Sequence, residues 1–434
     1  MNLNRRDFMK TVGVSTAGAL TALSYSRVAG ANEQLNLAMV GGAPARNVAR
    51  QERTKVVAVC DVDENRMPEH EGASVYYDFR EMLEEMEGDI DAVVIGVPDH
   101  SHFPIAILSM SLGKHVFVEK PLANTFQETE LLMEAEKEYN VVTQMGNQGH
   151  SGANYHQFKA FAEAGLMDGV NKVVSYFNRD RRWHPWGDVE GYPEGEEVPE
   201  GLHWDLWHTT AEERPFSGRY HPGNWRGWYR YGMGAIGDWG PHILDTAHRF
   251  LELGLPTQVE LVHVERHNPY IYPLETTLKF TFPARGEKPP VEVYWYDGED
   301  NLPPEGERFD SAGKVLFGGE YDFVGETHGS PLRVIPESKH QEVEEDLPDF
   351  ETASDHYANF VLSALGEETT RSPFEVAGPL NQVFTLGVIA QELGRVGEPL
   401  TFDPDRKRFV DDDRANELLS YPPPREGWEL YYNL

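Results

Sequence analysis

The sequence predicts an α/β protein, with a Rossmann-like, doubly wound parallel sheet followed by an α+β domain that has a mainly antiparallel, open sheet. Up to about residue 149, short apolar segments alternate with helical patterns, which is typical of parallel strands covered by helices. Beyond that point, segments that alternate between apolar and polar residues prevail, as in a sheet with one covered face. The length of 434 residues suits two such domains.

Five short apolar runs are expected to form the parallel sheet, at residues 35–40, 56–60, 92–97, 115–118 and 141–145. A helical pattern over residues 104–112 joins the third run to the fourth. The helix after the first strand has room only from Pro44 to Glu52, which is about 14 Å of α-helix against a strand of about 20 Å. We therefore expect an unusually short first connection.

The C-terminal part begins with a helix over about residues 153–164 and a strand over 170–178. A long excursion rich in Pro, Gly and Trp then runs to about residue 234. The remaining expected elements are strands at 258–266, 276–282 and 291–296, a surface insertion at 298–349, and helices at about 353–364 and 379–393. The predicted divisions are a signal peptide at 1–31, a Rossmann-like domain at 32–149, and a substrate and oligomerisation domain at 150–434, whose tail packs back onto the body.

The N-terminus has the pattern of a twin-arginine signal peptide. Arg5 and Arg6 precede a weakly apolar segment from Val12 to Leu23, and the small residues Ala29-Gly30-Ala31 supply a cleavage site. The apolar run is shorter than the about 20 residues that span a bilayer as a helix. We therefore expect a periplasmic or extracellular protein that is exported by the twin-arginine route.

Composition excludes several kinds of partner. The formal net charge of −34 repels nucleic acid and anionic lipid, so neither nucleic acid nor a membrane is an expected partner. Cys60 is the one cysteine, which rules out an intramolecular disulfide, and its apolar surroundings indicate a buried residue rather than a nucleophile. The histidines show no spacing typical of metal ligands.

Three polar residues are candidates for catalysis. Lys120 follows the strand at 115–118, and ligands of open α/β sheets bind beyond the carboxyl ends of strands. Asp238 and His242 are four residues apart, so they share one face if the segment is helical. The alternatives are a solvated ion pair at the strand end, an Asp238 that caps a helix, and a His242 that is part of the core.

The expected nucleotide turn departs from the usual pattern. A dinucleotide fold places three spaced glycines after the first strand, whereas this turn has Gly41 and Gly42 and no spaced third glycine. Asp61 follows the second strand, where a carboxylate accepts ribose hydroxyls and repels a 2′-phosphate. This favours NAD over NADP, unless Asp61 merely caps the next helix.

Seven of the nine tryptophans lie between residues 183 and 239, a stretch that takes in most of the excursion. Sugars present apolar CH faces that pack on flat rings, and arginines donate to their hydroxyls. Trp225, Arg226 and Trp228 are therefore candidate substrate contacts. The alternative is that most of these rings pack against one another in the protein interior.

Six segments carry a resemblance to a known family: Pro98–His102, Gly113–Pro121, Gly146–Gly149, Trp204–Trp207, Asn224–Trp228 and Gly237–Asp245. Their order and spacing resemble the glucose–fructose oxidoreductase/inositol dehydrogenase (Gfo/Idh/MocA) family over nearly the whole chain after residue 34. The resemblance implies a catalytic group in front of the nicotinamide. His242 would be the general base for a sugar hydroxyl, with a pKa near neutral, Lys120 would hold that hydroxyl, and Asp238 would orient the substrate or tune His242.

The resemblance also implies a cofactor site and an assembly. The expected cofactor-binding residues are Gly41, Gly42, Asp61, Pro98, His102, Glu119, Lys120, Asn147 and Gln148. Pairing of the second sheet implies a homo-oligomer, a dimer or a tetramer. The expected function is an exported NAD(P)-dependent oxidoreductase that acts on a hydroxyl or keto group of a sugar, glycoside or related polyol, with a tightly bound cofactor. The alternative, suggested by the shortened glycine turn, is a redox-silent relative that binds carbohydrate or acts as a keto-sugar hydro-lyase without a nucleotide.

Overall fold

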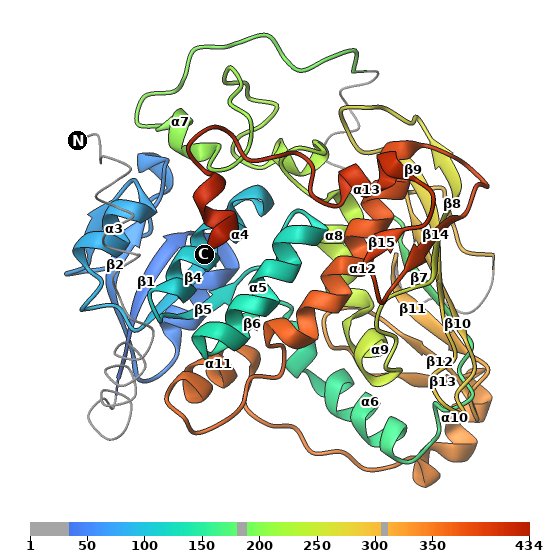
Figure 1. Ribbon diagram of the computed structural model, residues 1–434. Helices are drawn as coiled ribbons and strands as arrows, with labels where there is room; N and C mark the ends of the chain where they lie inside the picture. Colours follow the sequence, from blue (N-terminus) through green and yellow to red (C-terminus); the bar gives the residue numbers. More distant parts are fainter. Residues whose placement is uncertain (1–33, 180–188, 305–310) are drawn as a thin grey trace.

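The computed structural model describes residues 34–179, 189–304 and 311–434, and it contains two sheets that are joined by helices (Figure 1). The N-terminal sheet has six parallel strands. Their order across the sheet is β3 (Ser74–Tyr76), β2 (Thr54–Cys60), β1 (Leu35–Gly41), β4 (Ala92–Gly96), β5 (His115–Val118) and β6 (Thr143–Met145). The Rossmann-like parallel sheet predicted from the sequence is therefore confirmed. The five expected strands are present, and the short β3 is an addition because its exposed residues carry no apolar run.

Helices cover both faces of the parallel sheet because its strands bury side chains on both sides. The residues Leu37 and Met39 of β1 pack toward the 3-10 helix η1 (Ala43–Arg50) and α11 (His356–Ala364). The alternate residues Ala38 and Val40 belong to the opposite core. That core is covered by α3 (Phe79–Glu85), α4 (His102–Ser111) and α5 (Phe126–Tyr139).

The connection between β1 and β2 differs from the α-helix expected over residues 44–52. It is the 3-10 helix η1, which has eight residues and ends at Arg50. A 3-10 helix rises about 2.0 Å per residue against about 1.5 Å for an α-helix, so eight residues reach about 16 Å instead of about 12 Å. Because its rise per residue is larger, the 3-10 helix lets this short connection span the length of the strand.

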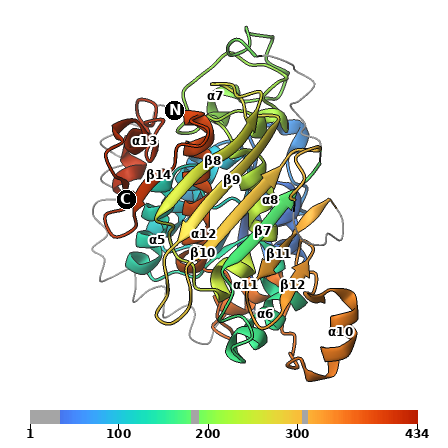
Figure 2. The ribbon, with the colours of Figure 1, turned by 90° about the vertical axis from the view of Figure 1, so that its right-hand side faces the viewer.

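The second sheet has nine strands, and Figure 2 shows most of them side by side. Their order is β13 (Arg333–Ile335), β12 (Asp322–Gly325), β11 (Ala312–Phe317), β7 (Lys172–Phe177), β10 (Val291–Asp297), β9 (Glu275–Phe282), β8 (Gln258–Glu265), β14 (Leu400–Asp403) and β15 (Arg408–Phe409). β7 and β10 pair in parallel and the other neighbours are antiparallel, which confirms the predicted mainly antiparallel sheet. The helices that pack on its inner face are α6 (Ala153–Glu163), α8 (Gly234–Ile243), α9 (Asp245–Phe250) and α12 (Phe374–Leu393).

Two expectations about the C-terminal part are wrong. The segment 298–349 is not a surface insertion, because β11, β12 and β13 extend the sheet beyond β7 and bury residues such as Leu316 and Phe323. These strands are short and separated by glycines and acidic residues, so the sequence does not mark them as strands. They become strands because β11 pairs with β7, β12 with β11 and β13 with β12. In addition, α12 begins at Phe374, so Pro379 lies inside the helix and not at its start.

The excursion and the C-terminal tail lie together over the strand ends of the parallel sheet. The excursion holds the short helix α7 (Trp204–Trp207) and the 3-10 helix η6 (Asn224–Gly227). The tail passes through α13 (Asp413–Leu418) and ends in η8 (Glu429–Asn433), and in Figure 1 its red ribbon runs beside α7 to a terminus near α4. Within residues 34–179, 189–304 and 311–434, no helix has the length and apolar character to cross a membrane.

Candidate active site

Lys120 and Asp238 join the two sheets at the carboxyl end of β5. Lys120 follows the β5 strand, while Asp238 lies in α8, which packs on the second sheet. The Lys120 Nζ donates to Asp238 Oδ1 at 2.6 Å and to the backbone oxygen of Asp238 at 2.8 Å. Both side chains keep some exposure, 14% and 21%, so a ligand can reach them. Asp238 lies within the helix and does not cap it.

His242 lies one turn further along α8 and is almost fully buried. Its Nδ1 has no hydrogen-bond partner among the described residues. Burial, followed by the charge of Lys120, holds the pKa of His242 well below its usual value. This direction differs from the near-neutral pKa expected from the sequence, because burial favours the neutral imidazole. A neutral, unpartnered ring nitrogen is an acceptor ready for a proton.

His328 covers the ring of His242. It lies in the turn after β12, and the two imidazoles stack with centroids 4.0 Å apart and planes 20° apart. The backbone N–H of His328 donates to the backbone oxygen of His242 at 3.1 Å. Sequence reasoning missed His328 because it lies in the segment interpreted as an insertion, where no motif marks it.

Only one of the three expected substrate contacts reaches the site. Arg226 Nε lies 3.4 Å from Asp238 Oδ1, and its guanidinium carbon lies 4.1 Å from the centroid of the Trp225 ring. The rings of Trp225 and Trp228 are buried in an aromatic cluster of the excursion. The structure therefore places both tryptophans where they support the loop, and it places Arg226 where it can donate to a ligand.

Glu119 and Asn147 present buried oxygens at the ends of β5 and β6. Glu119 Oε1 and Asn147 Oδ1 have no hydrogen-bond partner among the described residues. Burial raises the pKa of Glu119 to about 7, against the opposing charge of Lys120. A Cβ on Gly146 would lie 2.7 Å from Glu119 Oε2, so the glycine is needed for this close packing. Both oxygens are acceptors without a donor, which is the complement of an amide N–H such as that of a nicotinamide carboxamide. Gln148 follows at the start of the 3-10 helix η4 (Gln148–Ser151) and is partly exposed.

Pro98 opens the turn after β4, whose side chains shape the floor of the site. His102 bridges two backbone oxygens, with Nδ1 2.6 Å from Pro121 O and Nε2 3.0 Å from Val97 O. His102 therefore links the chain after β4 to the chain after β5 through these two contacts. Asp99, which was not among the expected site residues, accepts the N–H of Met233 just before α8 at 3.1 Å. Burial raises the pKa of Asp99 to about 7, and the charge of Arg226 opposes that rise.

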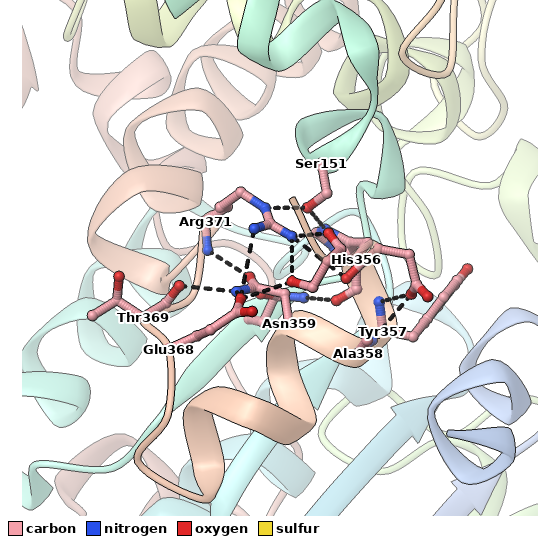
Figure 3. Close-up of polar contacts among 11 residues, drawn as sticks. Ser151, His356, Tyr357, Ala358, Asn359, Glu368, Thr369 and Arg371 are labelled. Carbon is pink, nitrogen blue, oxygen red and sulfur yellow. Dashed lines mark hydrogen bonds and ion pairs between the residues drawn. The ribbon is translucent and has the colours of Figure 1, made fainter. Parts of the chain in front are cut away.

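A polar network anchors the chain just beyond Asn147 (Figure 3). Ser151 Oγ lies 2.8 Å from His356 Nδ1, and Arg371 Nε donates to the same hydroxyl oxygen at 3.0 Å. Asn359 Oδ1 accepts the backbone N–H of Arg371 at 2.9 Å. The network fastens η4 to α11, which holds the end of β6 in place.

The opposite end of the expected cofactor site does not fit an adenosine. Gly41 and Gly42 form the turn after β1, and Gly42 N–H donates to Gly96 O at 3.2 Å. Asp61 Oδ1 accepts the N–H of Asp63 at 3.0 Å, and burial raises the pKa of Asp61. The space between the ends of β1, β2 and β4 is a cavity of about 40 Å³. Ordinary ligand pockets measure about 300 Å³ or more. The cavity at this end is therefore too small for an adenosine.

Two sequence models of one oxidoreductase family match this chain. The model described as the family's NAD-binding Rossmann fold matches residues 35–147, and the model described as its C-terminal alpha/beta domain matches residues 152–275. Together they cover more than half of the chain. Fold and sequence thus match the two-domain architecture of an oxidoreductase family with a Rossmann domain. The chain belongs to the Gfo/Idh/MocA family.

Among curated proteins, the chain is 29% identical over 166 residues to a glycosyl hydrolase family 109 protein of Shewanella pealeana, a match that covers 30% of this chain and 36% of that protein. It is 27% identical over 173 residues to levoglucosan dehydrogenase of Pseudarthrobacter phenanthrenivorans, with 39% and 35% covered. The chain therefore spans about a third of the length of these relatives.

Solved structures share the fold over both domains. The WlbA dehydrogenase of Bordetella pertussis, solved in complex with NADH and UDP-GlcNAcA, is 14% identical with a TM-score of 0.57, and 85% of this chain and 99% of that chain are covered. The aldose-aldose oxidoreductase of Caulobacter crescentus, complexed with glycerol, is 16% identical with a TM-score of 0.53, and 85% and 100% are covered. At these identities the likeness shows the fold alone.

Proposed function

We propose that this protein carries out acid–base chemistry at a hydroxyl or keto carbon of a sugar, glycoside or related polyol, with Lys120, Asp238 and His242 as its catalytic residues. The observation that carries the proposal is the contact of Lys120 Nζ with Asp238 Oδ1 at 2.6 Å, beside the unpartnered Nδ1 of His242. Groups contributed by both domains meet at a partly open strand end, where ligands of such folds bind.

Each residue has a role that its surroundings support. The neutral His242 accepts a proton from the substrate, and its low pKa favours early return of that proton. Lys120 donates to the substrate oxygen and stabilises negative charge that develops there. Asp238 orients the Lys120 ammonium through their hydrogen bond, and Arg226 offers a further donor beside it.

The first form of this chemistry is that of an NAD-dependent oxidoreductase. When bound, NAD would supply the hydride acceptor. Support comes from the family, from relatives named for sugar dehydrogenase or oxidoreductase activity, and from the unpartnered oxygens of Glu119 and Asn147. Asp61 at the end of β2 favours NAD over NADP. The twin-arginine pattern at Arg5 and Arg6 supports export, which would require a tightly held cofactor. Export and a homo-oligomeric state are part of this proposal.

The second form is a redox-silent enzyme or carbohydrate-binding protein, which the small cavity beside Asp61 favours. In a hydro-lyase of this kind, His242 removes the proton next to a keto group and the C–H electron pair becomes the new double bond. The β-oxygen then departs with the pair of its C–O bond and takes up the proton from His242. The reaction is complete without an external oxidant or reductant.

Turnover measurements with a panel of aldoses, polyols, glycosides and keto-sugars test the proposal. Lys120→Ala should lose turnover by roughly 10²–10⁴, the range expected for a positioned acid–base group. Lys159→Ala is the matched control, because Lys159 is exposed on α6 and pairs only with the neighbouring Glu163 among the described residues. Equal turnover of the two variants on the best substrate would exclude the proposed site.

A further inference from the structure

We infer that this chain fills the adenosine half of its own dinucleotide site, so that the folded protein binds neither NAD nor NADP in the extended form. The site lies at the point where β1 and β4 diverge in strand order, the place where open α/β sheets bind their ligands. The cavity left there measures about 40 Å³, enough for a few water molecules and not for a purine. Its walls include Leu206 and Trp207 of α7 and Trp428 of the tail.

Trp207 is held rigidly over the strand ends. Its ring is 2% exposed and stacks on Trp204, with centroids 4.5 Å apart. His100, in the turn after β4, places its ring 4.7 Å from that of Trp207 and its Nε2 2.9 Å from the Trp207 backbone oxygen. These contacts hold both the backbone and the ring of Trp207 in place, so the residue is a fixed part of the protein interior.

The segment before α7 is fastened to the loop that follows β2. His203 N–H donates to Val62 O at 2.8 Å, and Glu64 N–H donates to Gly201 O at 2.9 Å. Asp63 is largely buried and pairs with His221 Nε2 at 2.8 Å. The excursion therefore lies directly against the end of β2, where Asp61 was expected to receive a ribose.

The C-terminal tail secures the other side of α7. Arg425 Nε donates to Thr209 O at 2.7 Å, and its Nη1 donates to Asp205 Oδ1 at 2.7 Å. Trp428 is buried, and the guanidinium carbon of Arg80 lies 4.7 Å from its ring centroid. In Figure 1 this red segment crosses beside α7, so the tail and the excursion close the cavity together.

The glycine turn lies next to the side chain of Arg46. In dinucleotide folds its glycines let the pyrophosphate approach the backbone. Here a Cβ on Gly42 would lie 3.0 Å from Arg46 Nη2, and because Arg46 is exposed its guanidinium can move away, so the packing of Trp207 and Trp428 and not this turn carries the inference. The short 3-10 helix η1 positions Arg46 at this point.

The filled half-site selects the second form of the proposed function, in which Lys120 and His242 act through proton transfer alone. The inference rests on the proposed function only for that chemistry, since the packing around Trp207 is independent of it. The ligand class that remains is a single polar ring of sugar size, bound at the partly exposed side chains of Lys120, Asp238 and Arg226.

Nucleotide content and binding of the purified protein test the inference. Denatured protein should release no dinucleotide that ultraviolet absorbance or mass spectrometry detects. Calorimetry with NAD, NADP and ADP-ribose should show no saturable binding below about 1 mM, the upper end of ordinary enzyme affinities. A stoichiometric dinucleotide, or binding in the micromolar range, would overturn it.

Variants that enlarge the cavity test which side chains fill the adenosine half of the site. Trp207→Ala and Trp428→Ala should each bind adenine at least about tenfold more tightly than the unmodified protein, because truncation of a buried ring leaves a cavity that a flat molecule enters. Trp228→Ala is the control, since Trp228 is equally buried but does not line the cavity. Circular dichroism confirms folding of each variant. Equal adenine affinity in all three variants would contradict the assignment.

The outcome for Lys120→Ala separates this inference from the proposed function. Loss of turnover in that variant together with bound NAD in the unmodified protein would overturn only the inference. Absence of NAD with unchanged turnover in Lys120→Ala would overturn only the proposed function.

Discussion

His328 stacks on His242 with ring centroids 4.0 Å apart, although 86 positions separate the two residues in the chain. The contact joins α8 to the turn after β12 and leaves Nδ1 of His242 without a partner among the described residues. Two imidazolium ions cannot be stabilised at this distance, so each ring lowers the tendency of the other to take up a proton.

Replacement of His328 should therefore alter the pH dependence of His242. In His328→Phe the stack is retained while the neighbouring charge is lost, so the pKa of His242 should rise. The acid limb of the kcat/KM profile should move to higher pH, with turnover at neutral pH changed by less than about tenfold. His340→Phe, on α10 (Glu337–Val343), is the control. An unshifted profile would show that His328 only packs against the ring.

Lys120 and His242 should lose their effects together. Each change to Ala should lower turnover by roughly 10²–10⁴, and the double variant should be little worse than the poorer single variant. Steady-state kinetics on the best sugar measure this, with thermal unfolding as the check on folding. Multiplicative losses would mean that the two residues act at separate steps.

Stability should fall on acidification below pH 6.5. Burial lowers the pKa values of His100, His102, His115, His208 and His248 to about 4 and that of His356 to about 3. The unfolded chain protonates these residues near pH 6.5 while the folded chain does not, so each removes on the order of 3 kcal/mol of the free energy of unfolding by pH 4.

Asp99 and Glu119 act in the opposite direction. Their pKa values are raised to about 7, so the folded chain takes up these two protons first as the pH falls, which adds stability. The six histidines together lower the free energy of unfolding by more than the two carboxyls raise it, because the pKa shifts are of similar size. Urea unfolding at pH 7 and pH 5 measures the balance, and equal or greater stability at pH 5 would contradict the assigned burial.

Gly240→Ala should destabilise the protein by about 1–3 kcal/mol, the usual cost of an overpacked core. A Cβ at Gly240 would lie 2.8 Å from the ring of Phe384 on α12. Gly88→Ala is the matched control, because a Cβ there meets no atom within 4 Å. Denaturant unfolding compares the two, and an equal change in both would show that α8 and α12 can separate at no cost.

Replacement of Arg5 and Arg6 by lysine should trap precursor in the cytoplasm. The twin-arginine pair is the reason for the export proposal, and residues 1–33 lie outside those that the structure describes. Cell fractionation with detection of the unprocessed chain measures the effect. Normal processing and export of the variant would remove the basis for a periplasmic or extracellular location.

Much of the fold can be predicted from the sequence because buried strands have a local signature. The apolar runs that become β1, β2, β4, β5 and β6 are continuous, and each lies within two residues of its expected bounds. β11, β12 and β13 could not be recognised in this way. Their short runs resemble loop sequence until neighbouring strands supply the hydrogen bonds and cover their apolar side chains.

By itself, the sequence determined the order of the two sheets and singled out three polar residues as candidates, because periodicity, four-residue spacing and motif resemblance are properties of consecutive residues. Lys120, Asp238 and His242 could be selected in this way. Only the tertiary structure placed His328 on His242 and buried Trp228, since those contacts join segments far apart in the chain. The tertiary structure alone also decided that Trp207 and Trp428 close the cavity beside Asp61. Packing between remote segments sets the size of a cavity, and no local pattern encodes it.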